Sequence, residues 1–129
     1  TGIMQTLIQK YPQIDGVWAD SGLQGSGAAE AFMDAGMTVP PVTGEDFNRF
    51  LKMWKENNLT AVGVTFSVRM GYESVQIAKK VLQGEQVPHH DVVPNLVITD
   101  ANIDKYVRMD LPDDYWAESM PEVADMLFK

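Results

Sequence analysis

Two carboxylates follow a short β-type run within residues 42–48, where Glu45 and Asp46 stand directly before a segment with helical spacing. When a strand of an open α/β sheet runs into a helix, unpaired backbone N–H groups are exposed at the sheet edge. Acidic side chains at this point form a polar edge that accepts hydrogen bonds from hydroxyl groups. A buried carboxylate needs several donors to offset its desolvation, and a polyol presents several. The stretch therefore predicts half of a cleft for a polyhydroxylated ligand.

The elements that must position this edge alternate along the chain. Segments with helical spacing alternate with apolar, β-branched runs, in the order 2–11, 14–19, 28–35, 39–43, 47–56, 59–65, 69–83 and 92–99. We expect Gly36, Asn57-Asn58 and Gly84 to end helices, and Ser67 to cap the helix over 69–83. This order predicts an α/β fold, a Rossmann-like three-layer arrangement around a parallel sheet with right-handed crossovers.

The alternation of helices and strands looks incomplete at both ends of the sequence. The chain opens on a helix, although a doubly wound domain normally starts from a strand that becomes central, so we expect the first strand in a preceding segment. After Asp100 the periodicity breaks. We expect one helical turn over 102–106, an ordered loop over 111–116 whose Tyr115 and Trp116 pack on the rest, and a short helix over 121–127.

Composition excludes several classes of function. The 129 residues, 45% of them hydrophobic, suit a single domain with a real core. A net charge of -8, with no basic run longer than Lys79-Lys80, argues against a nucleic-acid partner. No apolar run reaches the roughly 20 residues that span a bilayer. The absence of cysteine excludes disulfides and thiolate chemistry but leaves the compartment open.

Other motifs have structural interpretations. Asp46 is a candidate helix N-cap, and Asp20-Ser21 a candidate turn. The glycines of residues 22–27 do not complete a dinucleotide loop, because Glu30 stands where its third glycine belongs. His89-His90 has no third ligand at metal spacing, and no nucleophile elbow supports hydrolysis, so neither a metal nor a cofactor is expected.

Three motifs occur in an order that resembles the C-terminal part of type I periplasmic sugar-binding proteins, such as the ribose-binding protein. They are residues 11–21 (YPQIDGVWADS), 41–46 (PVTGED) and 71–85 (GYESVQIAKKVLQGE), and together they lie within the first hundred residues. The resemblance implies a non-enzymatic solute receptor of an ABC importer. Such a receptor holds a sugar or polyol between two lobes that close about a hinge.

The resemblance also implies a domain organisation and partners. Residues 1–99 correspond to the C-terminal ligand-binding lobe, in which 92–99 form the third of three hinge-crossing strands, and residues 100–129 to a tail that packs on the lobes. The implied partners are the sugar, the N-terminal lobe of the same protein and the ABC permease subunits. The implied location is the periplasm, or the cell exterior with a membrane tether in a Gram-positive organism.

Three polar residues match ligand-binding positions of the family, and Asp20 beside the first of them is a fourth candidate. Ser21, preceded by Asp20, takes a position where the family usually has Asn, and Asp46 matches a carboxylate that accepts bonds from sugar hydroxyls. Thr65 takes the position of a longer Gln, which implies a larger ligand, a bridging water or no contact. Aromatic rings stack on the apolar face of a pyranose, and the candidates for this role are Trp18, Phe47 and Phe66.

Two alternative functions use related folds. The effector domain of a lactose-repressor-type transcription regulator has the same lobes, although such regulators usually end soon after the last crossing, whereas this chain continues for about thirty residues that include Trp116. A flavodoxin-like enzyme or a receiver domain is the other alternative. A receiver needs an acidic cluster beside a phosphorylatable Asp at its first strand, and the sequence contains no such strand.

Overall fold

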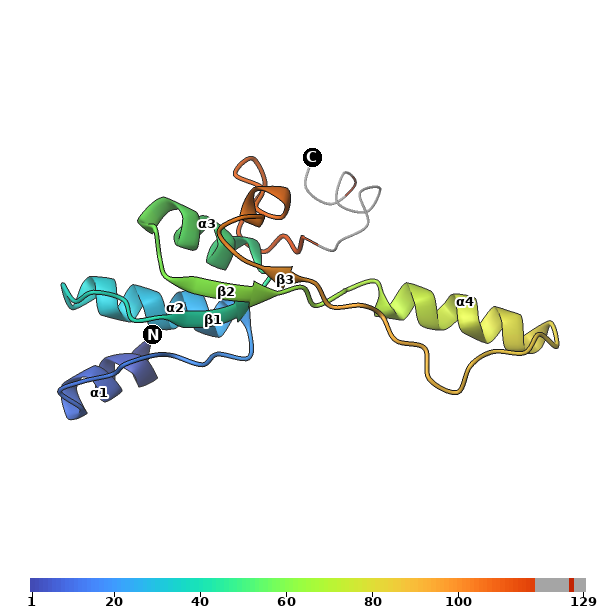
Figure 1. Ribbon diagram of the computed structural model, residues 1–129, viewed down its shortest axis with the longest axis horizontal. Helices are drawn as coiled ribbons and strands as arrows, with labels where there is room; N and C mark the ends of the chain where they lie inside the picture. The colour runs from blue at the N-terminus through green and yellow to red at the C-terminus, as the bar shows by residue number, and fades with distance from the viewer. Residues whose placement is uncertain (118–125, 127–129) are drawn as a thin grey trace.

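The computed structural model describes residues 1–117 and residue 126 (Figure 1). Its elements, in chain order, are helix α1 (Gly2–Lys10), helix α2 (Gly22–Asp34), strand β1 (Val42–Glu45), helix α3 (Asn48–Asn57), strand β2 (Ala61–Val64), helix α4 (Met70–Leu82), strand β3 (Val97–Ile98) and the 3-10 turn η1 (Ile103–Lys105). The predicted alternation of helices and strands is confirmed from α2 to β3, with shorter strands, but no strand stands between α1 and α2. The helix expected over 121–127 lies outside the described residues, apart from Met126.

The sheet has the order β1-β2-β3. Strands β1 and β2 are parallel, with Val42 opposite Ala61, whereas β3 pairs antiparallel with β2, with Val64 opposite Val97. The prediction of a parallel last strand is therefore wrong. After β2 the chain travels out through α4 and returns along the same path, so β3 runs against β2 (Figure 1). The strand predicted over 14–19 is reduced to a single parallel bridge between Val17 and Val42.

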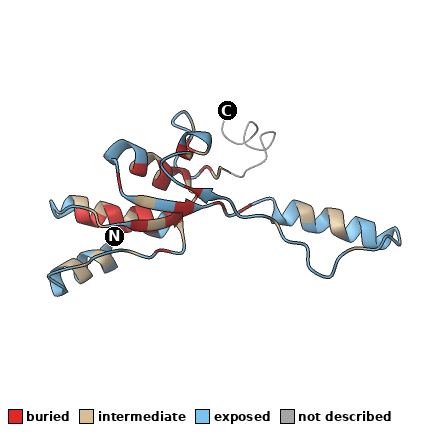
Figure 2. Ribbon diagram, viewed as in Figure 1, coloured by how far each residue is buried: buried red, intermediate tan, exposed pale blue. Residues whose placement is uncertain are grey.

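The core lies between the sheet and α3, with α2 packed beside β1 and α3 (Figure 2). The predicted apolar face of α3 is confirmed, because Phe50, Leu51 and Trp54 are all buried. Ile98 of β3 and Ile103 of η1 belong to the same core cluster. The segment that follows β3 is therefore part of this core.

Close contact between α3 and the sheet requires glycine in β1. A Cβ atom added to Gly44 would lie 2.5 Å from Cε1 of Phe50, a ring that is fully buried. The ring thus packs directly on the strand backbone. Helix α3 then ends as predicted, at Asn58 in the left-handed conformation with φ of 49°.

Helix α4 stands apart from the sheet and is joined to it by two segments that lie side by side and run in opposite directions (Figures 1 and 2). None of its residues is buried, and Val75 and Leu82 are 57% and 87% exposed. The predicted inward stripe on this helix, which also includes Gly71 and Ala78, therefore packs on nothing in the described part of the chain. The predicted Ser67 cap is wrong as well, because Arg69 takes the N-cap position and no side chain caps the helix.

Residues 108–117, which we call the C-terminal strap, are fastened to the start of α3 by one side chain. The amide Nδ2 of the fully buried Asn48 donates to the carbonyl oxygens of Arg108, Leu111 and Pro112 at 2.8, 3.2 and 2.9 Å, and its Oδ1 accepts from the Arg108 N–H at 2.9 Å. The bonds are shared, since an amide has only two donor hydrogens.

Backbone carbonyls of the strap also bind the first N–H groups of α3. The N–H of Asn48 donates to the Tyr115 carbonyl at 2.9 Å, and that of Arg49 to the Asp113 carbonyl at 3.0 Å. These groups otherwise lack partners at a helix start. The prediction that Tyr115 and Trp116 pack on the rest is confirmed: Tyr115 is buried, and Trp116 forms an antiparallel bridge with Phe47.

We expect Gly44→Ala to destabilise the protein by about 1–3 kcal/mol, because the added methyl group has no room beside the Phe50 ring. The free energy of unfolding, measured by urea titration, checks this. Gly2→Ala in α1 is the matched control, since its new Cβ would meet nothing within 4 Å and alanine favours a helix. Equal effects of the two substitutions would contradict the packing argument.

We expect Asn48→Ala to cost roughly 2–4 kcal/mol, because it removes a fully buried amide and leaves partly buried backbone groups of the strap without this partner. Asn48→Asp should cost at least as much, since a carboxylate would face three carbonyl oxygens. Thermal unfolding with matched denaturant titration measures both. Asn57→Ala is the control, because its amide bonds only the Met53 carbonyl at the exposed end of α3.

Candidate functional site

The carboxyl ends of three chain segments meet at one edge of the sheet. Asp20 and Ser21 follow the segment that bridges to β1 at Val17, Asp46 follows β1, and Thr65 follows β2. In α/β sheets this edge is the usual place for a ligand. The structure therefore brings the four predicted polar residues to a common edge.

Thr43 fixes the first part of this edge. Its Oγ1 accepts a hydrogen bond from the Ala19 N–H and donates one to the Ala19 carbonyl, both at 2.8 Å. The hydroxyl replaces the strand pairing that ends after Val17 and holds the turn at Asp20 beside β1. Ser21 is the N-cap of α2, where its Oγ accepts from the Gln24 N–H at 3.2 Å. The interpretation of Asp20-Ser21 as a turn agrees with the bend at both residues, and the capping role of Ser21 was not predicted.

Asp46 is fully buried at the end of β1. Its Oδ1 accepts a hydrogen bond from the Phe66 N–H at 2.9 Å, and so ties β1 to the segment that leaves β2. The interpretation of Asp46 as a helix N-cap is wrong. Phe47 takes that position, and the strap carbonyls bind the first N–H groups of α3. The carboxylate therefore faces the strand ends rather than the helix.

Thr65 is also fully buried, and it joins the two runs of chain that lead to and from α4. Its N–H donates to the Leu96 carbonyl, and its Oγ1 accepts from the Leu96 N–H, both at 2.8 Å. These bonds extend the antiparallel pairing of β2 and β3 by one residue. The Thr65 side chain therefore holds together the two segments that lead to and from α4.

Glu45 adds a third carboxylate to Asp20 and Asp46 at this edge. Burial raises the pKa of the Glu45 carboxyl above its ordinary value, the backbone N–H of Gly22 opposes that rise, and the charges of Asp46 and Asp20 add to it. The edge is therefore strongly acidic, and groups that donate hydrogen bonds fit it better than anions do.

Two of the three predicted aromatic residues lie beside Asp46. Phe66, whose N–H binds the carboxylate, is 46% exposed, and the Phe47 ring lies 5.2 Å from that of Trp116, tilted by 55°. Trp18 does not join them. It is 85% exposed and lines a hollow of about 410 Å³ together with Ile3 and Met4 of α1.

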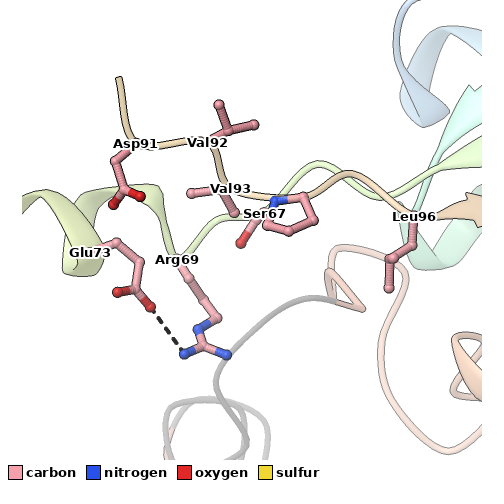
Figure 3. A pocket seen from close by; sticks show the side chains of 8 residues that line it. Ser67, Arg69, Glu73, Asp91, Val92, Val93 and Leu96 are labelled. Atoms are coloured by element: carbon pink, nitrogen blue, oxygen red, sulfur yellow. Dashed lines mark hydrogen bonds and ion pairs between the residues drawn. The ribbon is translucent and has the colours of Figure 1, made fainter. Parts of the chain in front are cut away.

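A second hollow, of about 420 Å³, lies between the two crossing runs and the first turn of α4 (Figure 3). Its polar lining is Ser67, Arg69, Glu73 and Asp91, and its apolar lining is Val92, Val93, Pro94 and Leu96. Arg69 and Glu73 form an ion pair at 3.1 Å. None of the four predicted polar site residues lines this hollow.

Sequence reasoning missed Thr43 and Asn48, and it did not identify Phe47 as the partner of Trp116. The partners of these side chains lie 24 or more residues away along the chain, so no local spacing could have revealed them. Within residues 1–117, no helix is long and apolar enough to cross a membrane, and no three His, Cys, Asp or Glu side chains gather as a metal site.

Comparisons with known proteins identify a matching family and several similar structures. A family model described as a periplasmic binding protein domain matches residues 2–86. An ABC transporter solute-binding protein from Thermobispora bispora is 27% identical, with a TM-score of 0.76 over 88% of this chain and 35% of its own. A protein from Mycobacterium smegmatis in complex with β-D-fucofuranose is 27% identical, with a TM-score of 0.70 over 80% of this chain and 35% of its own.

A third structure, an ABC transporter solute-binding protein from Agrobacterium vitis with bound D-fucose, is 23% identical and shares the fold, with a TM-score of 0.69 over 81% of this chain and 37% of its own. No curated protein matches the chain significantly. The chain spans about a third of the length of the structures that it matches. Because the family model matches well over half of it, the chain belongs to the periplasmic binding protein domain family and has the α/β fold of one lobe of such two-lobed, Rossmann-like proteins.

Proposed function

We propose that this chain is part of the solute receptor of an ABC importer, and that it holds a sugar or related polyol at the edge formed by Asp20, Ser21, Asp46 and Thr65. The observation that carries the proposal is Asp46, a desolvated carboxylate at a strand end among two further carboxylates. Such an arrangement suits a ligand with many hydroxyl donors. Two relatives, at 27% and 23% identity, were solved with D-fucose forms bound.

The ligand reaches Asp46 in this proposal when the segment that carries Phe66 moves. The Phe66 N–H occupies Oδ1 of Asp46, and the Phe66 side chain is already half exposed. A hinge motion at this segment would free carboxylate lone pairs for sugar hydroxyls. The protein captures its ligand without chemical change, as a binding protein rather than an enzyme.

The N-terminal lobe of the same protein is the partner that we propose for α4. The helix exposes apolar side chains that a solvated helix does not need: Met70, Tyr72, Val75, Val81 and Leu82. This proposal changes the predicted domain boundaries, which assigned residues 1–99 to one lobe and residues 100–129 to a tail. Residues 1–64 and 97–117 form one lobe, residues 65–69 and 92–96 cross the hinge, and α4 packs on the other lobe.

The remaining partners follow from the receptor role. The closed receptor presents its sugar to the permease subunits, either in the periplasm or, in a Gram-positive organism, tethered outside the membrane. A lactose-repressor-type regulator would use the same lobes. Permease and ATPase genes beside the gene for this protein would support the receptor over the regulator.

We expect Asp46→Ala in the full-length protein to weaken sugar binding by roughly 2–4 kcal/mol, because charge-assisted hydrogen bonds in a desolvated site are lost. Asp46→Asn should also weaken it, since an amide accepts fewer and weaker bonds. Calorimetric titration with D-fucose measures both, and the exposed Asp15→Asn is the control. An Asp46→Asn variant with wild-type affinity would remove the ligand role from this residue.

We expect Val75→Asp to destabilise the full-length protein by about 2–4 kcal/mol, because the proposed lobe contact would bury this side chain. Lys80→Asp, on the opposite face of α4, should change stability by less than about 0.5 kcal/mol. Urea unfolding of both variants provides the comparison. If Val75→Asp proves as harmless as Lys80→Asp, the helix stays in solvent and the proposed lobe contact is absent.

A further inference from the structure

The C-terminal strap places Trp116 beside the candidate site in a fixed register. Residue 116 pairs with Phe47 in an antiparallel bridge, and the Ala117 N–H donates to the Asp46 carbonyl at 3.3 Å. The Asn48 N–H donates to the Tyr115 carbonyl on the other side of the bridge at 2.9 Å. Trp116 is therefore held next to Asp46 by backbone bonds on both of its neighbours.

The surroundings of Trp116 differ from those of a core tryptophan. Trp54 is 1% exposed, and its indole N–H donates to Asp100 Oδ1 at 2.8 Å. Trp116 is only half-buried, and it packs on the Phe47 ring at a tilt of 55°. Within residues 1–117, no acceptor binds its indole N–H, and no buried side-chain donor in this range lacks a partner, so the N–H is open to solvent. It can therefore donate to a bound ligand without breaking a bond within these residues.

We propose that Trp116 is a ligand contact that selects cyclic sugars over open-chain polyols. The inference rests on the proposed function and adds a specificity-determining residue to it. The ring of a cyclic sugar has a flat C–H face that stacks on an indole, and its hydroxyls can accept a hydrogen bond from the indole N–H. An open-chain polyol lacks a rigid C–H face. Trp116 therefore stabilises one ligand class more than the other.

The strap sets the position of this contact. Asn48 binds three strap carbonyls and the Arg108 N–H, and Lys52 Nζ donates to the Leu111 carbonyl at 2.6 Å. These bonds come from α3, the same helix that follows Asp46. The backbone at Asp46 and the strap at Trp116 are thus both fastened to the start of α3.

The test compares two ligand classes in the full-length protein by calorimetric titration. The cyclic probes are D-fucose and D-allose, and the open-chain probe is allitol. We expect Trp116→Ala to weaken binding of the cyclic probes about tenfold, with less than a threefold change for allitol. Trp116→Phe, which retains packing on Phe47 but lacks the indole N–H, should lie between wild type and Trp116→Ala. Tyr11→Ala, an exposed aromatic residue at the end of α1, is the control.

The outcomes separate this inference from the proposed function. If the wild-type protein binds none of the three probes, both fail. If it binds a cyclic probe and Trp116→Ala changes that affinity less than twofold, only the role of Trp116 fails. If Trp116→Ala weakens the binding of cyclic and open-chain probes equally, the selective role of Trp116 is also overturned, because such a result indicates that the whole site is distorted. A fluorescence change on D-fucose binding that disappears in the folded Trp116→Phe variant would support the contact directly.

Discussion

The side-chain amide of Asn48 is the interaction on which the proposed ligand edge of this lobe depends. It is fully buried, and it satisfies backbone groups of a segment sixty residues further along the chain. Without it, the carbonyl groups of Arg108 and Pro112 would lose the partner that the protein supplies in this partly buried region, and Leu111 would keep only Lys52. The start of α3, the strap and the turn that carries Asp46 are consequently one unit.

The acidic edge combines charges that repel each other with backbone groups that partly compensate for them. The Asp46 carboxylate accepts a hydrogen bond from the Phe66 N–H, and the Glu45 carboxylate accepts one from the Gly22 N–H at the start of α2. Hydrogen-bond donors of a bound ligand would add to the donors that the protein supplies. The proposed polyol supplies donors without bringing a further negative charge.

The parts of the fold that were predictable from sequence depend on local pattern. The apolar face of α3, the ends of the helices and the strand ends at Asp46 and Thr65 all follow from spacing or from turn residues. The direction of β3 was not predictable in this way, because it depends on the route that the chain takes through α4. The stripe on α4 was predicted to face inward, but none of its residues is buried by the described part of the chain. The cap assigned to Asp46 failed because a distant segment supplies the cap instead.

The paired hydrogen bonds between Thr65 and Leu96 have a mechanical consequence for the proposed two-lobed protein. Two independent tethers would let the lobes twist, slide and bend relative to each other. Two tethers joined at this point, in register with the β2–β3 pairing, behave as one narrow ribbon that bends most easily across its flat face. Opening and closing would then follow essentially one direction, and the acidic edge would meet the same surface of the opposite lobe each time.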